Sequence, residues 1–298
     1  MKLLSYSLFT ANKNFNHIRS WDVHKTTSNR YWVNIPSLIL VNSILYPDFK
    51  TKFYITPSIE SNELFPLLKH LSTDPTFNFL LEKWDLPYSG REPSVWRMCP
   101  VWDKSNEIVF SRDIDSLPNI SEFKSCKLFQ QNDCTIMSMR SHCGGHSPVC
   151  NAVRMLAGLS GFKPNKINFL PEKFDEYYHN SKNFGDWGLD QGVMIHYFLE
   201  KNSDEYIKIN FMDCAINCQT ENSTWPCVPV NDILLNNIKI SDLEKSILDI
   251  ISPLTDWAGK PIDSRSILKQ LISICGERGQ SINKILQSNV ILKQFYNV

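Results

Sequence analysis

Strand-forming and helix-forming segments alternate at the start of the chain, and this alternation restricts the possible folds strongly. Lys2–Thr10 and Lys52–Thr56 are short apolar stretches typical of strands, whereas Trp32–Leu45 carries apolar residues at helical spacing. Ser61–Ser72 predicts a second helix, in which Pro66 either disturbs the middle or marks the true start. Strands that alternate with helices form mostly parallel sheets covered by helices, so we expect an α/β fold.

A second constraint is the stretch Glu107–Asn119, EIVFSRDIDSLPN, in which two aspartates follow a short apolar strand. Pro118 ends any regular element there. Ligands of open α/β sheets bind at the carboxyl ends of the strands, which is where Asp113 and Asp115 would lie. One residue separates them, so both carboxylates can turn toward one hard cation such as Mg²⁺ or Mn²⁺. The alternative is that they are ordinary turn-forming or helix-capping residues.

Composition narrows the choice of partners. Lys+Arg and Asp+Glu are equal at 31 each, which gives no net positive charge for non-specific binding to nucleic acid or anionic membranes. Neither a Gly-x-Gly-x-x-Gly nor a Walker pattern occurs in the sequence, which argues against a Rossmann dinucleotide site and a P-loop NTPase. A small or neutral substrate is therefore favoured, with no nucleic-acid partner.

Cysteine usage and the N-terminal sequence indicate where the protein works. MKLLSYSLFTANKNF is too short and too polar for a signal peptide or membrane anchor. The 9 cysteines are odd in number and scattered, which favours reduced thiols over a disulfide framework. We expect a cytoplasmic protein without a transmembrane segment.

The pattern continues less regularly after the two aspartates. Cys134–Arg140 and Glu205–Phe211 predict strands, the second of them the last in the chain. Ala152–Leu159 predicts a helix closed by Gly161. Asn183–Phe198 combines a Gly-rich polar start with an apolar, helical second half.

The character of the chain changes at Val230. Residues 233–251 and 266–295 are amphipathic, helical and devoid of motifs. We therefore divide the chain into an α/β domain, residues 1–229, and a helical C-terminal extension, residues 230–298. The extension either packs on the sheet domain or offers a surface for an oligomer or another partner, and the sequence does not decide between these.

Four segments, taken in this order, resemble nucleotide-sugar-dependent glycosyltransferases of the GT-A fold, of the small type found in bacteria and large DNA viruses. The segments are RDIDS at 112–116, MRSHCGGH at 139–146, RMLAGLSGF at 154–162 and WGLDQGV at 187–193. The resemblance covers roughly the first 210 residues. It implies a GT-A-like fold, with a Rossmann-like sheet, and transfer of a sugar from a nucleotide-diphosphate sugar to a glycan or other hydroxyl acceptor.

The resemblance implies roles for the two aspartates and for the end of the first strand. Asp113 and Asp115 would hold Mn²⁺ or Mg²⁺ against the donor diphosphate, because the leaving nucleoside diphosphate gains negative charge as the glycosidic bond breaks. Tyr6 and Ser7 would bind the nucleotide base and ribose.

It also implies roles for two arginines and for an Asp-Gln pair. Arg97 and Arg112 would contact the diphosphate or the acceptor, since guanidinium groups pair bidentately with such anions; structural ion pairs are the alternative. Asp190 and Gln191 match the family's Asp-Gln; in inverting members a carboxylate there or nearby takes the acceptor proton, and in retaining members the group mainly positions substrates. Helix capping is the alternative for Asp190.

A histidine pair, His142 and His146, matches a strand-end position near the donor in the resembling sequences, and His146 is a candidate third metal ligand. The position before the first histidine is often acidic in the family, and it is Ser141 here. The resemblance therefore does not fix the role of this loop, and polar loop histidines without a ligand are the alternative.

A haloacid-dehalogenase-type, Mg²⁺-dependent phosphatase is the alternative enzyme. In such enzymes the first Asp of Asp-x-Asp is the nucleophile and the second a general acid, here Asp113 and Asp115, and a Gly-Asp-x-x-x-Asp motif, here with Asp186 and Asp190, binds Mg²⁺. The first motif normally lies near the N-terminus of these enzymes, and Leu117 stands where Thr or Val is usual. Both features count against a phosphatase.

A zinc-stabilised binding module is the non-enzymatic alternative. Its ligands would come from one of two sets: His142, Cys143, His146 and Cys150, or Cys214, Cys218 and Cys227. Neither set has the paired Cys-x-x-Cys spacing of common zinc sites, so free thiols are favoured.

Overall fold

The protein is described by a computed structural model that covers residues 1–9, 27–83, 93–139, 158–167, 211–213, 227–229, 232–255 and 260–297. Its chain divides into two compact units, and each unit combines separate stretches of sequence. Unit 1 comprises Met1–Leu3, Met98–Arg112 and Ile120–Ile240, and unit 2 comprises Leu4–Arg97, Asp113–Asn119 and Ser241–Val298.

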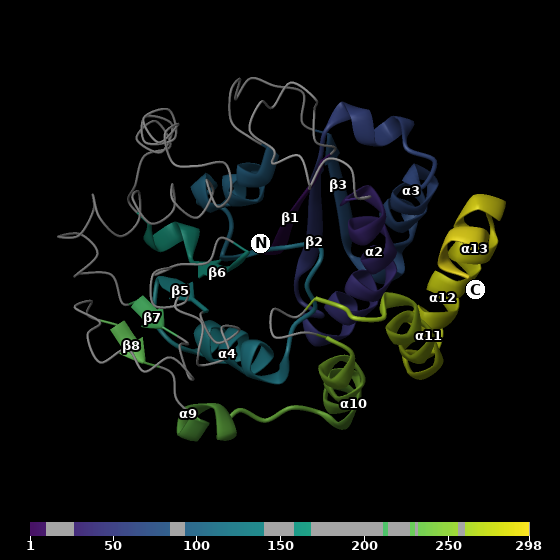
Figure 1. The fold of residues 1–298 in the computed structure, drawn as a ribbon. Helices are drawn as coiled ribbons and strands as arrows, with labels where there is room; N and C mark the ends of the chain where they lie inside the picture. The colour runs from purple at the N-terminus through teal and green to yellow at the C-terminus, as the bar shows by residue number, and fades with distance from the viewer. Residues whose placement is uncertain are drawn as a thin grey trace. The chain divides into compact units, whose positions relative to one another are not determined.

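Eight strands in the described part of the chain form a sheet in the order β3-β2-β1-β4-β6-β5-β7-β8 (Figure 1). The β2–β3, β5–β7 and β7–β8 pairs are parallel, and β6 is antiparallel to both β4 and β5. The expected α/β class, with a mostly parallel sheet flanked by helices, is confirmed. The strands are β1 Lys2–Leu8, β2 Lys50–Ile55, β3 Phe79–Lys83, β4 Ile108–Arg112, β5 Ile136–Ser138, β6 Leu159–Phe162, β7 Phe211–Asp213 and β8 Cys227–Pro229.

Unit 2 contains the strand–helix alternation expected from the sequence. Helix α2, Thr27–Leu45, follows β1, and α3, Phe65–Thr73, follows β2. Ile35, Leu38 and Ile39 of α2 are buried at helical spacing, which is what holds this helix against its neighbours. Proline occupies the first turn of α3, so it marks the start of the helix rather than disturbing its middle. β3 was not predicted.

Helix α2 carries a proline, Pro36, in its interior. Proline has no backbone N–H, so the carbonyl four residues earlier, that of Trp32, loses its helical donor. The hydroxyl of Tyr296, a buried residue of helix α13, Val290–Tyr296, donates a hydrogen bond to this carbonyl at 2.5 Å. Burial raises the pKa of Tyr296 well above its ordinary value, so the hydroxyl keeps its proton. The C-terminal helix thus supplies a hydrogen bond that α2 cannot make internally.

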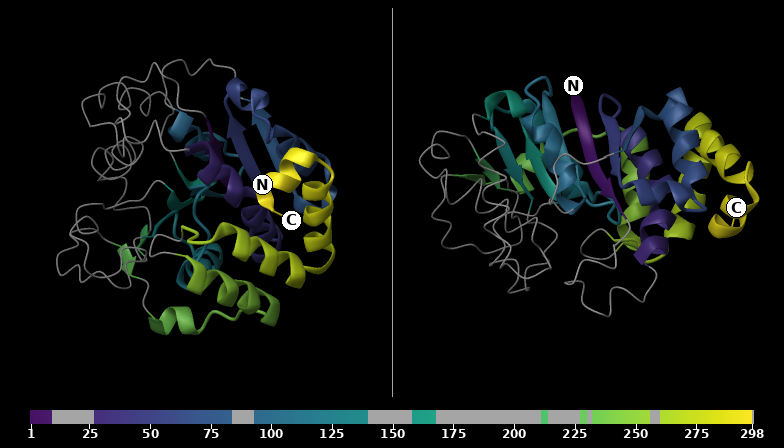
Figure 2. Two further views of the ribbon diagram at one scale, coloured as in Figure 1. Left: turned by 45° about the vertical axis from the view of Figure 1, so that its right-hand side comes forward. Right: turned by 90° about the horizontal axis from the view of Figure 1, so that it is seen from above.

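The C-terminal part of unit 2 is helical, as expected, and it packs on the N-terminal helices. Helices α11 and α12 lie against α2, and α12 also lies against α3; both views of Figure 2 show them together. Helices α11 and α12 approach each other closely at Gly279, where a Cβ would lie 2.1 Å from the carbonyl oxygen of Ile272. The helices of this region are α10 Asp242–Ile251, α11 Ser264–Ile274, α12 Gly276–Gln287 and α13.

Unit 1 differs more from the sequence prediction. Helix α4, Ile120–Gln131, was not predicted; it contacts α9, Asp232–Asn236. The predicted helix over 152–159 is wrong at its end, because Leu159 begins strand β6 and Gly161 lies inside that strand. The glycine is required by packing, since a Cβ there would lie 2.7 Å from the ring of Phe110 in β4. Glu205–Phe211 is also not the last strand, because β8 follows β7.

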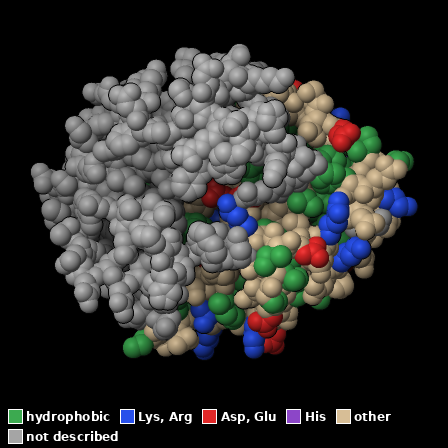
Figure 3. Space-filling model, in the orientation of Figure 1, with side chains coloured by type: hydrophobic (Ala, Val, Ile, Leu, Met, Phe, Trp, Pro, Cys, Tyr) green, Lys and Arg blue, Asp and Glu red, His purple; other side chains and the backbone are tan. Residues whose placement is uncertain are grey.

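Two further features concern the surface and the thiols. Within the described ranges, no helix is both long enough and apolar enough to cross a membrane. The cysteines described as free thiols are Cys99, Cys126, Cys134 and Cys275. On the described part of the face in Figure 3, acidic and basic side chains are interspersed.

Candidate functional site

The two aspartates predicted to bind a cation lie on a turn at the end of β4, within unit 2. The amide and hydroxyl of Ser116 both donate to the carbonyl of Asp113, at 3.4 and 3.2 Å. Nδ2 of Asn34, a buried residue of α2, donates to the carbonyl of Ile114 at 2.6 Å. Helix α2 therefore fixes the residue between the two aspartates. Asn34 was missed by the sequence analysis, where a lone amide on an apolar helix carries little signal.

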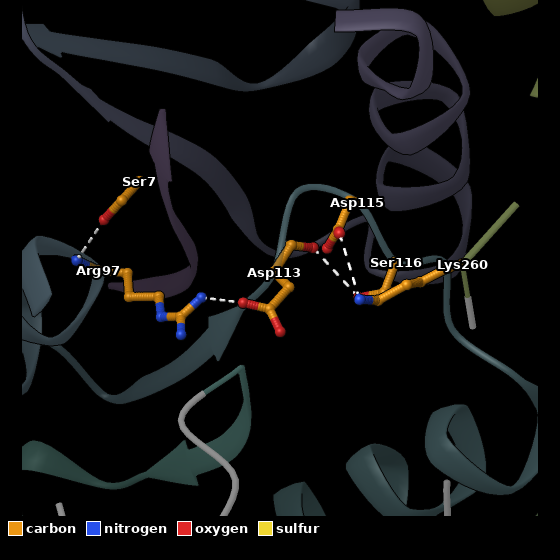
Figure 4. Close-up of polar contacts among 6 residues, drawn as sticks. All are labelled: Ser7, Arg97, Asp113, Asp115, Ser116 and Lys260. Atoms are coloured by element: carbon orange, nitrogen blue, oxygen red, sulfur yellow. Dashed lines mark hydrogen bonds and ion pairs between the residues drawn. The ribbon is translucent and has the colours of Figure 1, made fainter. Parts of the chain in front are cut away.

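Arg97 connects this turn to the end of β1 (Figure 4). It lies in the 3₁₀ helix Pro93–Trp102, and its backbone N–H donates to Oγ of Ser7 at 2.9 Å. Its guanidinium forms an ion pair with Oδ1 of Asp113. The Arg97 side chain is only 9% exposed, whereas that of Asp113 is 45% exposed. Ser7, Arg97 and Asp113, all predicted site residues, are thus brought together.

The second carboxylate faces a lysine that was not predicted. Nζ of Lys260 lies 3.6 Å from Oδ2 of Asp115, and the two side chains are 43% and 9% exposed. Lys260 comes from the connection that precedes α11, where the amide of Ile262 donates to the carbonyl of Leu254 at 2.8 Å. The sequence gives no signal for this lysine, since it belongs to no motif and lies far along the chain from the aspartates.

Two carboxylates of the turn lie opposite two cationic groups, a guanidinium and an ammonium. Figure 4 shows that Asp113 points toward Arg97 and Asp115 toward Lys260. Two carboxylates are suitable hard ligands for Mg²⁺ or Mn²⁺, which usually take further oxygens from water and substrate phosphates. Groups of three or more metal-ligating side chains are absent from the described residues, so such outside oxygens would be needed.

Tyr6 lies in the core rather than at the site. Nδ2 of Asn42 in α2 donates to its hydroxyl at 3.0 Å, and its ring centroid is 5.2 Å from that of Phe53 in β2. Successive residues of a strand point to opposite faces, so Tyr6 packs against α2 while Ser7 reaches Arg97. We therefore leave Tyr6 out of the site.

Arg112, the other predicted arginine, lies in unit 1 and forms a buried ion pair with Glu122 of α4. The side chains are 4% and 0% exposed. This geometry fits a structural ion pair, the alternative role for Arg112, because the buried guanidinium links β4 to α4.

Several predicted residues lie outside the described residues, and their roles stay predictions. These are Asp190 and Gln191, the histidines His142 and His146, and Asp186 of the phosphatase alternative. The candidate zinc ligands also lie outside the described residues, except that the backbone of Cys227 is described in β8.

Comparisons with known proteins do not identify a family for this chain. No protein-family model matches the sequence, and no curated protein matches it at a significant level. The contacts around Asp113 and Asp115 therefore carry the functional proposal.

Proposed function

We propose that the protein is a metal-assisted glycosyltransferase with a GT-A-like fold, which transfers a sugar from a nucleotide-diphosphate sugar to an acceptor hydroxyl. The observation that carries the proposal is the turn after β4, where Asp113 and Asp115 lie beside Arg97 and Lys260. A diphosphate together with a divalent cation fits such a mixture of anionic and cationic groups. The partners are a nucleotide-sugar donor and a glycan or other hydroxyl acceptor.

The residues of the turn would act on the leaving group. As the glycosidic bond breaks, the nucleoside diphosphate gains negative charge, and a bound Mn²⁺ or Mg²⁺ would neutralise part of it. Asp113 and Asp115 would hold that cation, with phosphate oxygens completing its coordination. The guanidinium of Arg97, anchored through its backbone to Ser7, would keep Asp113 oriented.

The acceptor side of the reaction rests on residues known only from the sequence. The Asp190 carboxylate would take the proton of the acceptor hydroxyl in an inverting enzyme, whereas Asp190 and Gln191 would position the substrates in a retaining one. His146 would supply a further metal ligand. Each of these roles is tested by substituting the residue once a donor is known.

A thermal-shift panel tests the proposal. UDP, GDP, CDP, ADP and TDP, with and without Mn²⁺, are compared on the wild type, Asp115→Asn and Asp133→Asn. Asp133 is the control, because it also pairs with a lysine, Lys166, but lies in unit 1. Ligands that bind only the folded state raise the melting temperature by mass action. One nucleotide should stabilise the wild type and Asp133→Asn only with metal, and Asp115→Asn should lose the effect.

The opposite result would favour the phosphatase alternative. If no nucleotide stabilises the protein and a phosphomonoester is hydrolysed with Mg²⁺, the glycosyltransferase proposal is overturned. Among the described residues, β1, β2 and β3 precede the strand that leads to the aspartates, whereas the phosphatases begin with that strand.

A further inference from the structure

Lys260 is held in place by local backbone structure. A β-bridge joins Thr255 to Pro261, the residue directly after the lysine. The carboxylate of Asp263 then caps α11 by accepting from the amide of Ser266 at 3.0 Å. The base of the Lys260 side chain is therefore fixed between a bridge and a capped helix, while its ammonium extends toward Asp115.

The contact between Lys260 and Asp115 has the geometry of an exchangeable pair. Charge-assisted hydrogen bonds between ammonium and carboxylate are about 2.7–2.9 Å long, whereas these atoms are 3.6 Å apart. The lysine side chain is 43% exposed and has a flexible stem, so it can move without disturbing the core. Arg97 is different, because its side chain is 9% exposed and its backbone N–H donates to Ser7.

The position of the lysine gives this exchange a direction. Because Lys260 faces Asp115, its ammonium repels a divalent cation that approaches this carboxylate alone. A diphosphate that arrives with the cation brings negative charge, which favours both the metal and an ammonium released from Asp115.

We infer that Lys260 exchanges partners at the turn: it competes with a divalent cation for Asp115 in the free protein, and contacts a phosphate oxygen when the cation and a diphosphate are bound. The second half of this inference rests on the proposed function. It makes the C-terminal segment part of the site, and predicts that metal and diphosphate bind cooperatively.

Lys260→Gln tests the inference, because the two halves predict changes of opposite sign. Removing the competing charge should tighten the binding of Mn²⁺ alone about thirtyfold, the effect of one unit charge on a divalent cation roughly 4 Å away at the dielectric constant of water. The same substitution should weaken inorganic diphosphate, measured in saturating Mn²⁺, by about fivefold or more. Free Mn²⁺ is measured by electron paramagnetic resonance, and diphosphate by calorimetry.

Two further variants act as controls. Lys83→Gln removes a lysine of matching exposure, 41%, from its ion pair with Glu60, and should leave both affinities unchanged. Lys260→Arg keeps the charge and should retain most of the diphosphate affinity. A loss in Lys260→Arg as large as that in Lys260→Gln would overturn the phosphate contact.

The outcomes separate this inference from the proposed function. If Lys260→Gln binds Mn²⁺ and diphosphate as the wild type does, while Asp115→Asn loses both, Lys260 has no such role and the turn remains the metal site. If both affinities fall together in Lys260→Gln, the lysine is merely structural. If the opposite changes occur but no nucleotide sugar serves as donor, the exchange stands and the glycosyltransferase proposal fails.

Discussion

Arg112 and Asp113 are neighbours in sequence, but their surroundings differ sharply. Arg112 is enclosed with Glu122, and both side chains are almost completely buried. Asp113 pairs with Arg97 and leaves 45% of its side chain exposed, and Asp115 faces a partly exposed lysine. A buried pair has no water to replace a lost partner, whereas an exposed carboxylate does. The difference shows that one short segment, RDIDS, supplies both a buried ion pair and a half-exposed carboxylate.

The largest expected effect is on the enclosed pair. Arg112→Met should lower the free energy of unfolding by about 3–5 kcal/mol, because it leaves the Glu122 carboxylate buried beside an apolar group. Urea-induced unfolding measures the loss. The double variant Arg112→Met/Glu122→Met should recover most of it. A loss below about 1 kcal/mol in the single variant would show that this pair is no more structural than an exposed one.

A second buried contact, the hydrogen bond from Tyr296 to Trp32, tests whether removing a buried partner also destabilises unit 2. Tyr296→Phe leaves the Trp32 carbonyl without the hydroxyl donor and should cost about 1–3 kcal/mol. In a Pro36→Ala background the helix has its own N–H, so the same substitution should cost less. Urea unfolding of the four proteins in this cycle gives the difference. Equal costs in both backgrounds would refute the link between Pro36 and Tyr296.

The ion pair between Arg97 and the half-exposed Asp113 should contribute less to the free energy of unfolding. Arg97→Met should cost only about 1 kcal/mol, because Asp113 can turn to water when its partner is removed. The same variant should weaken the binding of a nucleoside diphosphate with Mn²⁺, as followed by calorimetry. A stability loss as large as that of Arg112→Met, with unchanged binding, would reverse the comparison between the two arginines.

The smallest effect concerns the docking of α12 near α3. Partial burial by itself raises the pKa of Asp74, but hydrogen bonds from Ser281 and Thr76 outweigh it and lower the pKa below the ordinary 3.8. A lowered pKa stabilises the fold above pH 3.8, and this stabilisation is lost as the pH falls through the folded-state pKa. Ser281→Ala should therefore cost less than about 1 kcal/mol at pH 6, and the difference should shrink toward pH 2. A cost independent of pH would show that the Asp74 charge is not involved.

The sequence predicts the regular part of unit 2 because its elements follow simple periods. β1, α2 and β2 have clear apolar patterns, and the strand before the aspartates has one too. Helix α4 was missed because its pattern, ISEFKSCKLFQQ, places Glu122 and Ser125 on the buried side, where a helical period expects apolar residues. Gly161 was read as the end of a helix, although it makes room for the Phe110 ring in a strand.

The candidate site was predictable only where its residues lie close to a motif. Asp113 and Asp115 follow directly from the strand and turn, and Arg97 and Ser7 from the resemblance. Asn34 and Lys260 come from distant parts of the chain, and only tertiary packing brings them to the turn.

The central claim is that the turn carrying the half-exposed Asp113, unlike the enclosed pair beside it in sequence, binds a diphosphate through a metal. Calorimetric titration of the best nucleoside diphosphate into the wild type and Asp115→Asn, with Mn²⁺ and then with EDTA, tests it most directly. We expect tight binding by the wild type in Mn²⁺, a loss of tenfold or more in EDTA, about 1.4 kcal/mol, and an equal loss in Asp115→Asn. Equal affinity of the two proteins, or binding unaffected by EDTA, would contradict the account.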